Sequence, residues 1–231
     1  MSMLMQLGSS ATSANGAFMP HPLEPLTAAE IAQAVALLKA RGKVTATTRF
    51  VSVSLQEPAK ESVHNRQTPP RDAFVVLFDN ATNACYEAAL SLTNNELVSY
   101  RHVPGVQPTM TIDEQIECEQ AVLASEEFRA AIEKHYGLKD TSLVMVDIWS
   151  AGNYGSEEDR TKRLARPLCF IRSEPGENGY VRPIEGLRPV VDLNTMQVLR
   201  VEEYGHWPLP PGAANYAASR VPNQRTDVQP I

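Results

Sequence analysis

Two hairpin sequences of one pattern decide the fold: Leu92-Thr-Asn-Asn-Glu-Leu-Val98 and Leu193-Asn-Thr-Met-Gln-Val-Leu199, which start 101 positions apart. In each, apolar residues flank a short polar turn that contains asparagine, a residue that tolerates the positive φ of tight hairpins. A pattern repeated at this distance indicates two copies of one structural unit.

Each unit begins with a helix signal. Thr27-Ala-Ala-Glu30 and Thr111-Ile-Asp-Glu114 are capping boxes, in which the threonine hydroxyl and the glutamate carboxylate bind each other's free backbone amides. Apolar residues at helical spacing predict the buried stripes: Ile31, Ala34, Val35 and Leu38 in the first unit, and Ile112, Ile116 and Leu123 in the second. Ser125 predicts the cap of a companion helix that ends at Gly137.

Strand signals follow the helices in both units. The expected strands are 51–55, 73–78, 86–92 and 97–100, and then 143–150, 167–171, 187–193 and 196–202. The stretches 57–71 and 155–163 are predicted as loops. The predicted fold class is therefore α+β, with two tandem units, each a helix packed on a four-stranded antiparallel sheet.

Composition excludes several classes of function. The 231 residues suffice for two small domains, and 21 Lys and Arg against 27 Asp and Glu give a net charge of −6, which argues against nucleic acid or an anionic membrane as a partner. No apolar run reaches the roughly 20 residues of a membrane-spanning helix. Three cysteines without CxxC spacing and an N-terminus without the features of a secretory signal predict free thiols and a cytoplasmic location.

The sequence contains no common catalytic motif. The five histidines are isolated from one another, and Cys85 and Cys169 fall in strand patterns where small buried roles are usual. Helical spacing places Asp113 beside Glu117, as an acid/base pair would require. The favoured interpretation is instead a solvated helix face, formed by Asp113, Glu114, Glu117, Glu119, Glu126 and Glu127.

Trp149 is the most informative aromatic residue. Alternation along strand 143–150 places it with Met145, on the face opposite Val144, Val146 and Ile148. A strand buried on one side carries such residues on its other side only where something covers them. Two interpretations remain open: a tryptophan that faces a partner or ligand, and a second small core under neighbouring elements.

Three longer phrases carry a family resemblance. They are His21-Pro-Leu-Glu-Pro-Leu-Thr-Ala-Ala-Glu-Ile31, Val146-Asp-Ile-Trp-Ser-Ala-Gly152, and Gly205-His-Trp-Pro-Leu-Pro210 with Asn215-Tyr216 and the stretch 220–231. Together they resemble the N-terminal accessory region of copper-containing amine oxidases. The resemblance implies two cystatin-like units, at 21–105 (N2-like) and 106–208 (N3-like), after a disordered tail at 1–20 and before a linker at 209–231.

The resemblance also implies where the chemistry lies. In this family a separate β-sandwich holds Cu(II) through a His-x-His pair and a third histidine, and a tyrosine in an Asn-Tyr-Asp/Glu setting becomes topaquinone. This chain has no His-x-His, and its Asn153-Tyr154 and Asn215-Tyr216 are followed by Gly and Ala. We therefore expect no catalytic residue, copper or quinone in this chain, and the catalytic domain, in the same or a separate polypeptide, as its partner, with a homodimer formed through it.

The family pattern assigns Trp149, Ile148 and Ile116 to the wall of the substrate channel. The expected function is thus the channel-flanking accessory region of a primary amine oxidase, an enzyme class that converts primary amines to aldehyde, ammonia and hydrogen peroxide. The alternative is a free-standing cystatin-like binding module, and a self-contained enzyme of unrecognised chemistry is the remaining hypothesis.

Overall fold

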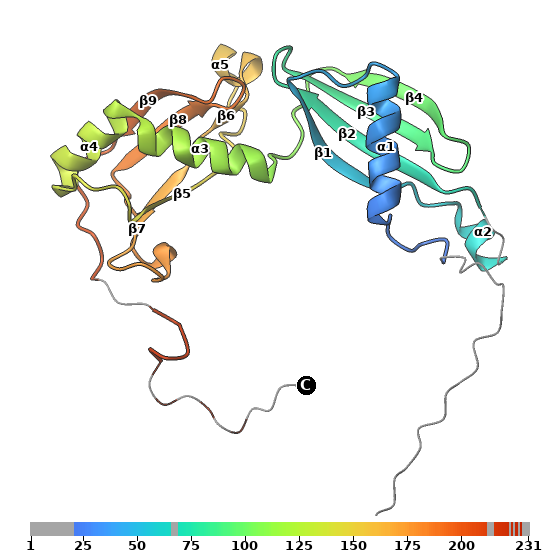
Figure 1. Ribbon diagram of the computed structural model, residues 1–231. Helices are drawn as coiled ribbons and strands as arrows, with labels where there is room; N and C mark the ends of the chain where they lie inside the picture. The colour runs from blue at the N-terminus through green and yellow to red at the C-terminus, as the bar shows by residue number, and fades with distance from the viewer. Residues whose placement is uncertain are drawn as a thin grey trace, which may run out of the picture.

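A computed structural model describes residues 21–65, 69–211 and 215–221, with 223, 225 and 227. The predicted tail at 1–20 lies outside the described residues, as does part of the predicted linker at 209–231. Across the described part, helices and antiparallel strands form two groups that follow each other along the chain (Figure 1). The α+β fold class is confirmed.

The first group contains a helix and a four-stranded meander. Helix α1 (Ala28–Ala40) lies across the sheet formed by β1 (Thr48–Leu55), β2 (Asp72–Asp79), β3 (Ala84–Ser91) and β4 (Glu96–Val103), paired in that order (Figure 1). A short helix, α2 (Lys60–His64), lies in the stretch that the prolines predict as loop.

The core of the first group follows the predicted patterns closely. Helix α1 starts at the Thr27–Glu30 capping box and buries Ala34, Leu37 and Leu38. These side chains pack on alternate residues of β2 and β3, including Val75, Leu77, Ala88 and Leu90. Ile31 was predicted to be buried, but it lies at the margin of this face and is 37% exposed.

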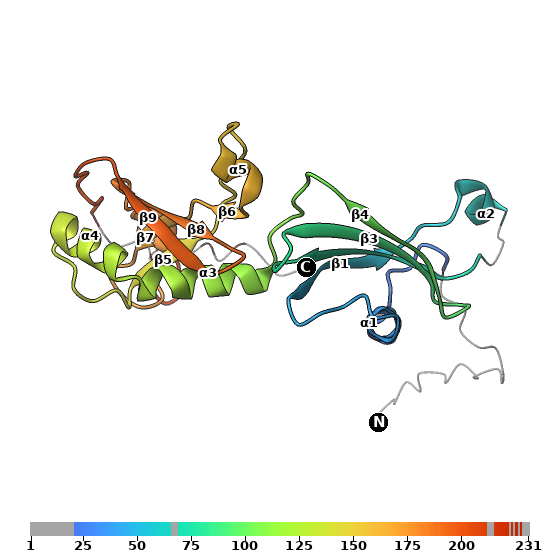
Figure 2. The ribbon, with the colours of Figure 1, turned by 90° about the horizontal axis from the view of Figure 1, so that it is seen from above.

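The second group follows the same general order, with a second long helix, a 3-10 turn and one more strand in the described residues. It comprises α3 (Ile112–Ala124), α4 (Glu126–Tyr136), β5 (Val144–Asp147), α5 (Glu157–Thr161), β6 (Leu164–Ala165), β7 (Leu168–Ile171), the 3-10 turn η1 (Gly179–Val181), β8 (Leu187–Asp192) and β9 (Gln197–Glu203). Helices α3 and α4 lie on one side of the strands, as α1 does in the first group (Figure 2).

The second sheet differs in detail from the predicted four strands. In the described part of the chain, β5 pairs with β7, whereas β6, β8 and β9 form a separate sheet. Pro167 has no amide hydrogen to donate, and it divides β6 from β7. The predicted strand 143–150 ends at Asp147, and Ser150 retains only an isolated bridge to Ala165.

The buried stripe of α3 also differs from the prediction. Glu114, Cys118 and Val122 are buried, whereas Ile112 is 79% exposed and Ile116 50% exposed. The helix is rotated because Glu114 has a buried cationic partner, described below. The predicted stripe is therefore wrong for Ile112 and Ile116, whereas Leu123 packs against the core as expected.

The hairpin repeat is present in the backbone. Asn95 and Met196, which are 101 positions apart, have φ angles of 53° and 54°. The asparagine of the first turn takes this left-handed conformation, as predicted, but in the second turn a methionine takes it. Leu92 and Leu193 also make matching hydrogen bonds, to the carbonyl oxygens of Arg71 and Arg163.

Candidate functional site

A carboxylate clamp occurs once in each group. In the first, the capping-box residue Glu30 accepts hydrogen bonds from Nε and Nη2 of Arg71, at 2.8 and 3.2 Å. The guanidinium group also donates to the carbonyl oxygens of Glu24 and Pro25, at 3.0 and 3.3 Å. Arg71, which immediately precedes β2, thus joins the start of β2 to the start of α1. It also binds the segment that precedes α1.

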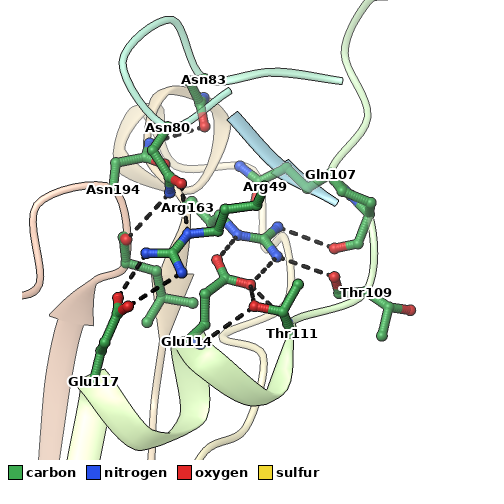
Figure 3. A network of polar contacts seen from close by, with 12 residues as sticks. Arg49, Asn80, Asn83, Gln107, Thr109, Thr111, Glu114, Glu117, Arg163 and Asn194 are labelled. Atoms are coloured by element: carbon green, nitrogen blue, oxygen red, sulfur yellow. Dashed lines mark hydrogen bonds and ion pairs between the residues drawn. The ribbon is translucent and has the colours of Figure 1, made fainter. Parts of the chain in front are cut away.

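The second clamp repeats these contacts (Figure 3). Arg163 Nε and Nη2 donate to Glu114 at 2.7 and 3.1 Å, and its terminal nitrogens donate to the carbonyl oxygens of Pro108 and Thr109 at 3.0 and 3.2 Å. Fork-like pairing of this kind is the strongest form of arginine–carboxylate contact. Sequence analysis found both capping boxes but missed their arginine partners. The position of each arginine, just before a strand in its unit, is the signal that could have found them.

Burial distinguishes the two clamps. The side chains of Arg71 and Glu30 are 18% and 20% exposed, whereas those of Arg163 and Glu114 are 3% and 1% exposed. The first group covers the second clamp, because the Arg163 guanidinium lies 4.6 Å from the ring centroid of Phe78, in β2. The second clamp is therefore part of the contact between the two groups.

Polar side chains surround this contact (Figure 3). Arg49 in β1 forms an ion pair with Glu117 in α3 at 2.6 Å, and it donates from Nε to Asn80 at 2.7 Å. Asn80 donates to Asn194 at 3.1 Å, and Asn194 donates to Asn83 at 3.0 Å. The network joins β1 and the β2–β3 turn to α3 and the second repeated hairpin.

The clamps shift the pKa values of their carboxyl groups. Arg71 hydrogen bonds lower the pKa of Glu30 from its ordinary value of 4.5 to about 2. Burial alone would raise the pKa of Glu114, but hydrogen bonds from Arg163 and Thr111 outweigh it and lower the pKa. Both glutamates are therefore carboxylates at neutral pH.

The second clamp also positions Trp149. Strand β6 starts immediately after Arg163, and its Leu164 carbonyl accepts a hydrogen bond from Ala151 at 3.2 Å. The amide of Arg166 donates to the Trp149 carbonyl at 2.8 Å. Backbone bonds at the Trp149 carbonyl and at Ala151 therefore connect this stretch to β6 and to Arg166, which follows it.

The Trp149 side chain is 56% exposed, and its indole Nε1 donates to Asp147 at 3.1 Å. It lines a surface pocket of about 300 Å³ with Tyr154, Arg166, Leu168 and Arg188. Ala151, Leu164 and Val190 form a small apolar cluster near this pocket, but Trp149 itself does not join it. Met145, predicted to share the uncovered face, lies against Gly179 instead.

The structure does not bring the three predicted channel residues together in this pocket. Ile148 packs against the main core of the second group, and Ile116 lies on α3, half exposed. Neither lines the pocket that contains Trp149.

Several of the other candidate carboxylates have structural partners. Glu117 binds Arg49 and does not pair with Asp113. The prediction of a solvated helix face was wrong for Glu114, which its arginine holds inside, and Glu119 accepts a hydrogen bond from the Val146 amide at 3.0 Å.

All three cysteines are unpaired and buried, as expected for structural thiols. Burial raises the pKa of each thiol, that of Cys118 to about 12, which opposes formation of a nucleophilic thiolate. No group of three or more His, Cys, Asp or Glu suited to a metal ion occurs among the residues with described positions. Across the same ranges, no helix is long and apolar enough to cross a bilayer.

Comparison with known families identifies the class of domain. Residues 27–100 match the AGAO-like N2 domain, and residues 113–218 match the copper amine oxidase N3 domain. The two matches follow each other in the same order as the two groups of elements. The chain therefore comprises N2 and N3 domains of the copper amine oxidase family.

Curated relatives agree with this family. A primary amine oxidase from Arthrobacter sp. (strain P1) is 37% identical over 212 residues, which cover 91% of this chain and 32% of the relative. A peroxisomal copper-containing diamine oxidase from Nicotiana tabacum is 34% identical, with the same two shares covered. The chain thus spans about a third of the length of these relatives.

Solved structures show the same fold. A copper-containing benzylamine oxidase from Hansenula polymorpha superposes with a TM-score of 0.73 at 19% identity, over 92% of this chain and 36% of that one. The lysyl oxidase of Pichia pastoris matches with a TM-score of 0.53 at 13% identity, over 96% of this chain and 35% of that one.

Proposed function

We propose that this chain is the accessory, channel-flanking region of a copper- and topaquinone-dependent primary amine oxidase. In this proposal its partner is the catalytic domain, in the same or a separate polypeptide, and any homodimer forms through that domain. Copper and the quinone would be held there and would supply the oxidative chemistry. The role of this chain is to shape the approach of the amine.

One observation carries the proposal: the matched N2 and N3 domains in tandem present an exposed tryptophan whose carbonyl is hydrogen-bonded to the chain just after β6. A tryptophan held in this way acts through shape and apolar contact. Trp149 is the channel-wall residue in this proposal, and Ile116, also exposed, is a second one. Ile148 has the weaker case because it packs against the core.

The proposal is tested in a chimeric oxidase. This chain replaces the matching third of the Arthrobacter sp. (strain P1) primary amine oxidase, and peroxide release is measured with methylamine and with benzylamine. We expect an active chimera in which Trp149→Ala changes the ratio of kcat/KM for the two amines by about tenfold, the effect of a lost apolar contact of 1–2 kcal/mol. Val98→Ala, at an exposed position in β4, is the matched control.

The channel role would be contradicted by an active chimera in which Trp149→Ala leaves the ratio of kcat/KM for the two amines unchanged. A chimera that folds and binds copper but stays inactive would favour the alternative, a free-standing binding module. The exposed pocket beside Trp149 is the feature that such a module would use.

A further inference from the structure

Two arginines, Arg166 and Arg188, line the pocket beside Trp149, whereas no carboxylate is among the described residues that line it. Glu202 in β9 accepts contacts from Arg166 at 3.2 Å, Arg200 at 3.2 Å and the Tyr204 hydroxyl at 2.6 Å. Arg200 also pairs with Glu158, at 3.0 Å. Both carboxylates therefore already bind partners other than Arg188.

Arg188 lies directly opposite Glu202 in the β8–β9 ladder, yet the two side chains form no ion pair. Within the described part of the chain, its guanidinium group makes no hydrogen bond, and its nearest aromatic contact is the Tyr204 ring at 5.9 Å. The Nε of Arg166 is inaccessible to water and likewise has no acceptor among the described residues. Both arginines line the 300 Å³ pocket.

We propose that this pocket docks an acidic side chain of the polypeptide that packs on the Trp149 face. A carboxylate matches the planar donor fork of Arg188, and the apolar part of the docked segment would lie on Trp149 and Leu168. Trp, Tyr and Arg are also the residue types that dominate the energetics of protein interfaces.

The exposure of the walls favours a protein side chain over a free small ligand. Trp149 is 56% exposed and Tyr154 86% exposed, so the pocket is a surface depression that encloses little of an occupant. Sites for free ligands normally bury most of the ligand surface. An approaching segment of a partner would itself supply the missing cover.

Charge separates the pocket from the amine path of the proposed function. Two guanidinium groups in the pocket attract a carboxylate and repel an ammonium ion, so the amine would contact the exposed part of Trp149 that lies outside the pocket. Naming the catalytic domain as the source of the acidic side chain rests on the proposed function, but the preference of the pocket for a carboxylate does not. The two ideas can therefore fail separately.

The test uses the whole chain labelled with ¹⁵N and two capped peptides, acetyl-Leu-Glu-Leu-amide and acetyl-Leu-Gln-Leu-amide. The indole N–H signal of Trp149 reports binding, and that of Trp207, which does not line the pocket, is the internal control. We expect the Glu peptide to bind at least about tenfold more tightly than the Gln peptide, the effect of one charge-assisted hydrogen bond. Arg188→Gln should remove this difference.

Arg101→Gln is the matched control, because Arg101 is an exposed arginine in β4 that pairs with Glu87. It should leave the difference between the peptides unchanged. Equal responses to both peptides, no response to either, or an unchanged preference in Arg188→Gln would overturn the inference. Propionate binding as tightly as the Glu peptide would overturn the assignment to a polypeptide. Each of these results leaves the peroxide assay of the chimera unaffected.

Discussion

The two clamps provide a matched pair of sites for one substitution. Glu114→Gln and Glu30→Gln each remove a carboxylate charge and keep an amide oxygen that can serve the capping box. In the second clamp the change leaves the Arg163 guanidinium, 3% exposed, without an ionic partner. Breaking a buried pair in this way costs about 3–5 kcal/mol, because the remaining charge is neither paired nor hydrated.

The first clamp is expected to respond far less. The side chains of Arg71 and Glu30 are 18% and 20% exposed, so water hydrates the cation that Glu30→Gln leaves behind. Partly exposed ion pairs of this kind contribute about 1 kcal/mol or less. The expected difference between the two variants is therefore about 3 kcal/mol in the free energy of unfolding.

Urea titration measures this difference with two signals. Both tryptophans, Trp149 and Trp207, belong to the second unit, so fluorescence follows that unit, whereas circular dichroism follows both. The double variant Glu114→Gln/Arg163→Met should recover at least about 1 kcal/mol relative to the sum of the single losses, because no unpaired buried charge remains. If Glu114→Gln destabilises the protein no more than Glu30→Gln does, the argument from burial is refuted.

Three further results are expected. Because the pKa of Glu30 is lowered from 4.5 to about 2 in the folded protein, its contribution to stability is fully present above pH 4.5 and is lost as the pH falls towards 2. Glu30→Gln should therefore reduce the dependence of Tm on pH between pH 4.5 and 2. The buried thiols should not react with a thiol-specific reagent at pH 8 in the native protein, and all three should react in urea; fast native labelling would contradict their burial and raised pKa. Gly152→Ala should cost about 1 kcal/mol in the same unfolding assay, because Gly152 has a φ of 76° and an added Cβ would lie 3.2 Å from the Tyr154 ring.

The fold could be predicted where the sequence signals are local. Capping boxes, alternation and turn residues act within a few positions, so α1 and the meander β1–β4 agree with expectation. Met196 shows the limit: it takes a left-handed conformation that its side chain disfavours, because the hairpin between β8 and β9 imposes it. The division of the second sheet at Pro167 likewise depends on how neighbouring strands pair.

The site was predictable only in part. Alternation placed Trp149 opposite Val144, Val146 and Ile148 but left open whether its side chain is exposed or covered. The pocket beside it needs Arg166, between β6 and β7, and Arg188, in β8, which meet only in the folded protein. The buried role of Glu114 could not be found from periodicity, since its partner Arg163 is 49 positions away and its cover, Phe78, lies in the other unit. Charges of this kind are placed by long-range contacts.

The repeated clamp explains how one unit influences the site on the other. The same contacts form a partly exposed ion pair at Glu30 and a buried one at Glu114, and the difference arises because Phe78 and its neighbours cover the second copy. Arg163 leads directly into β6, which fixes the backbone around Trp149. The contact between the units thus supports the second clamp, the clamp holds β6, and β6 supports the pocket. A change at the contact should therefore alter the surroundings of Trp149, although Trp149 does not belong to the contact.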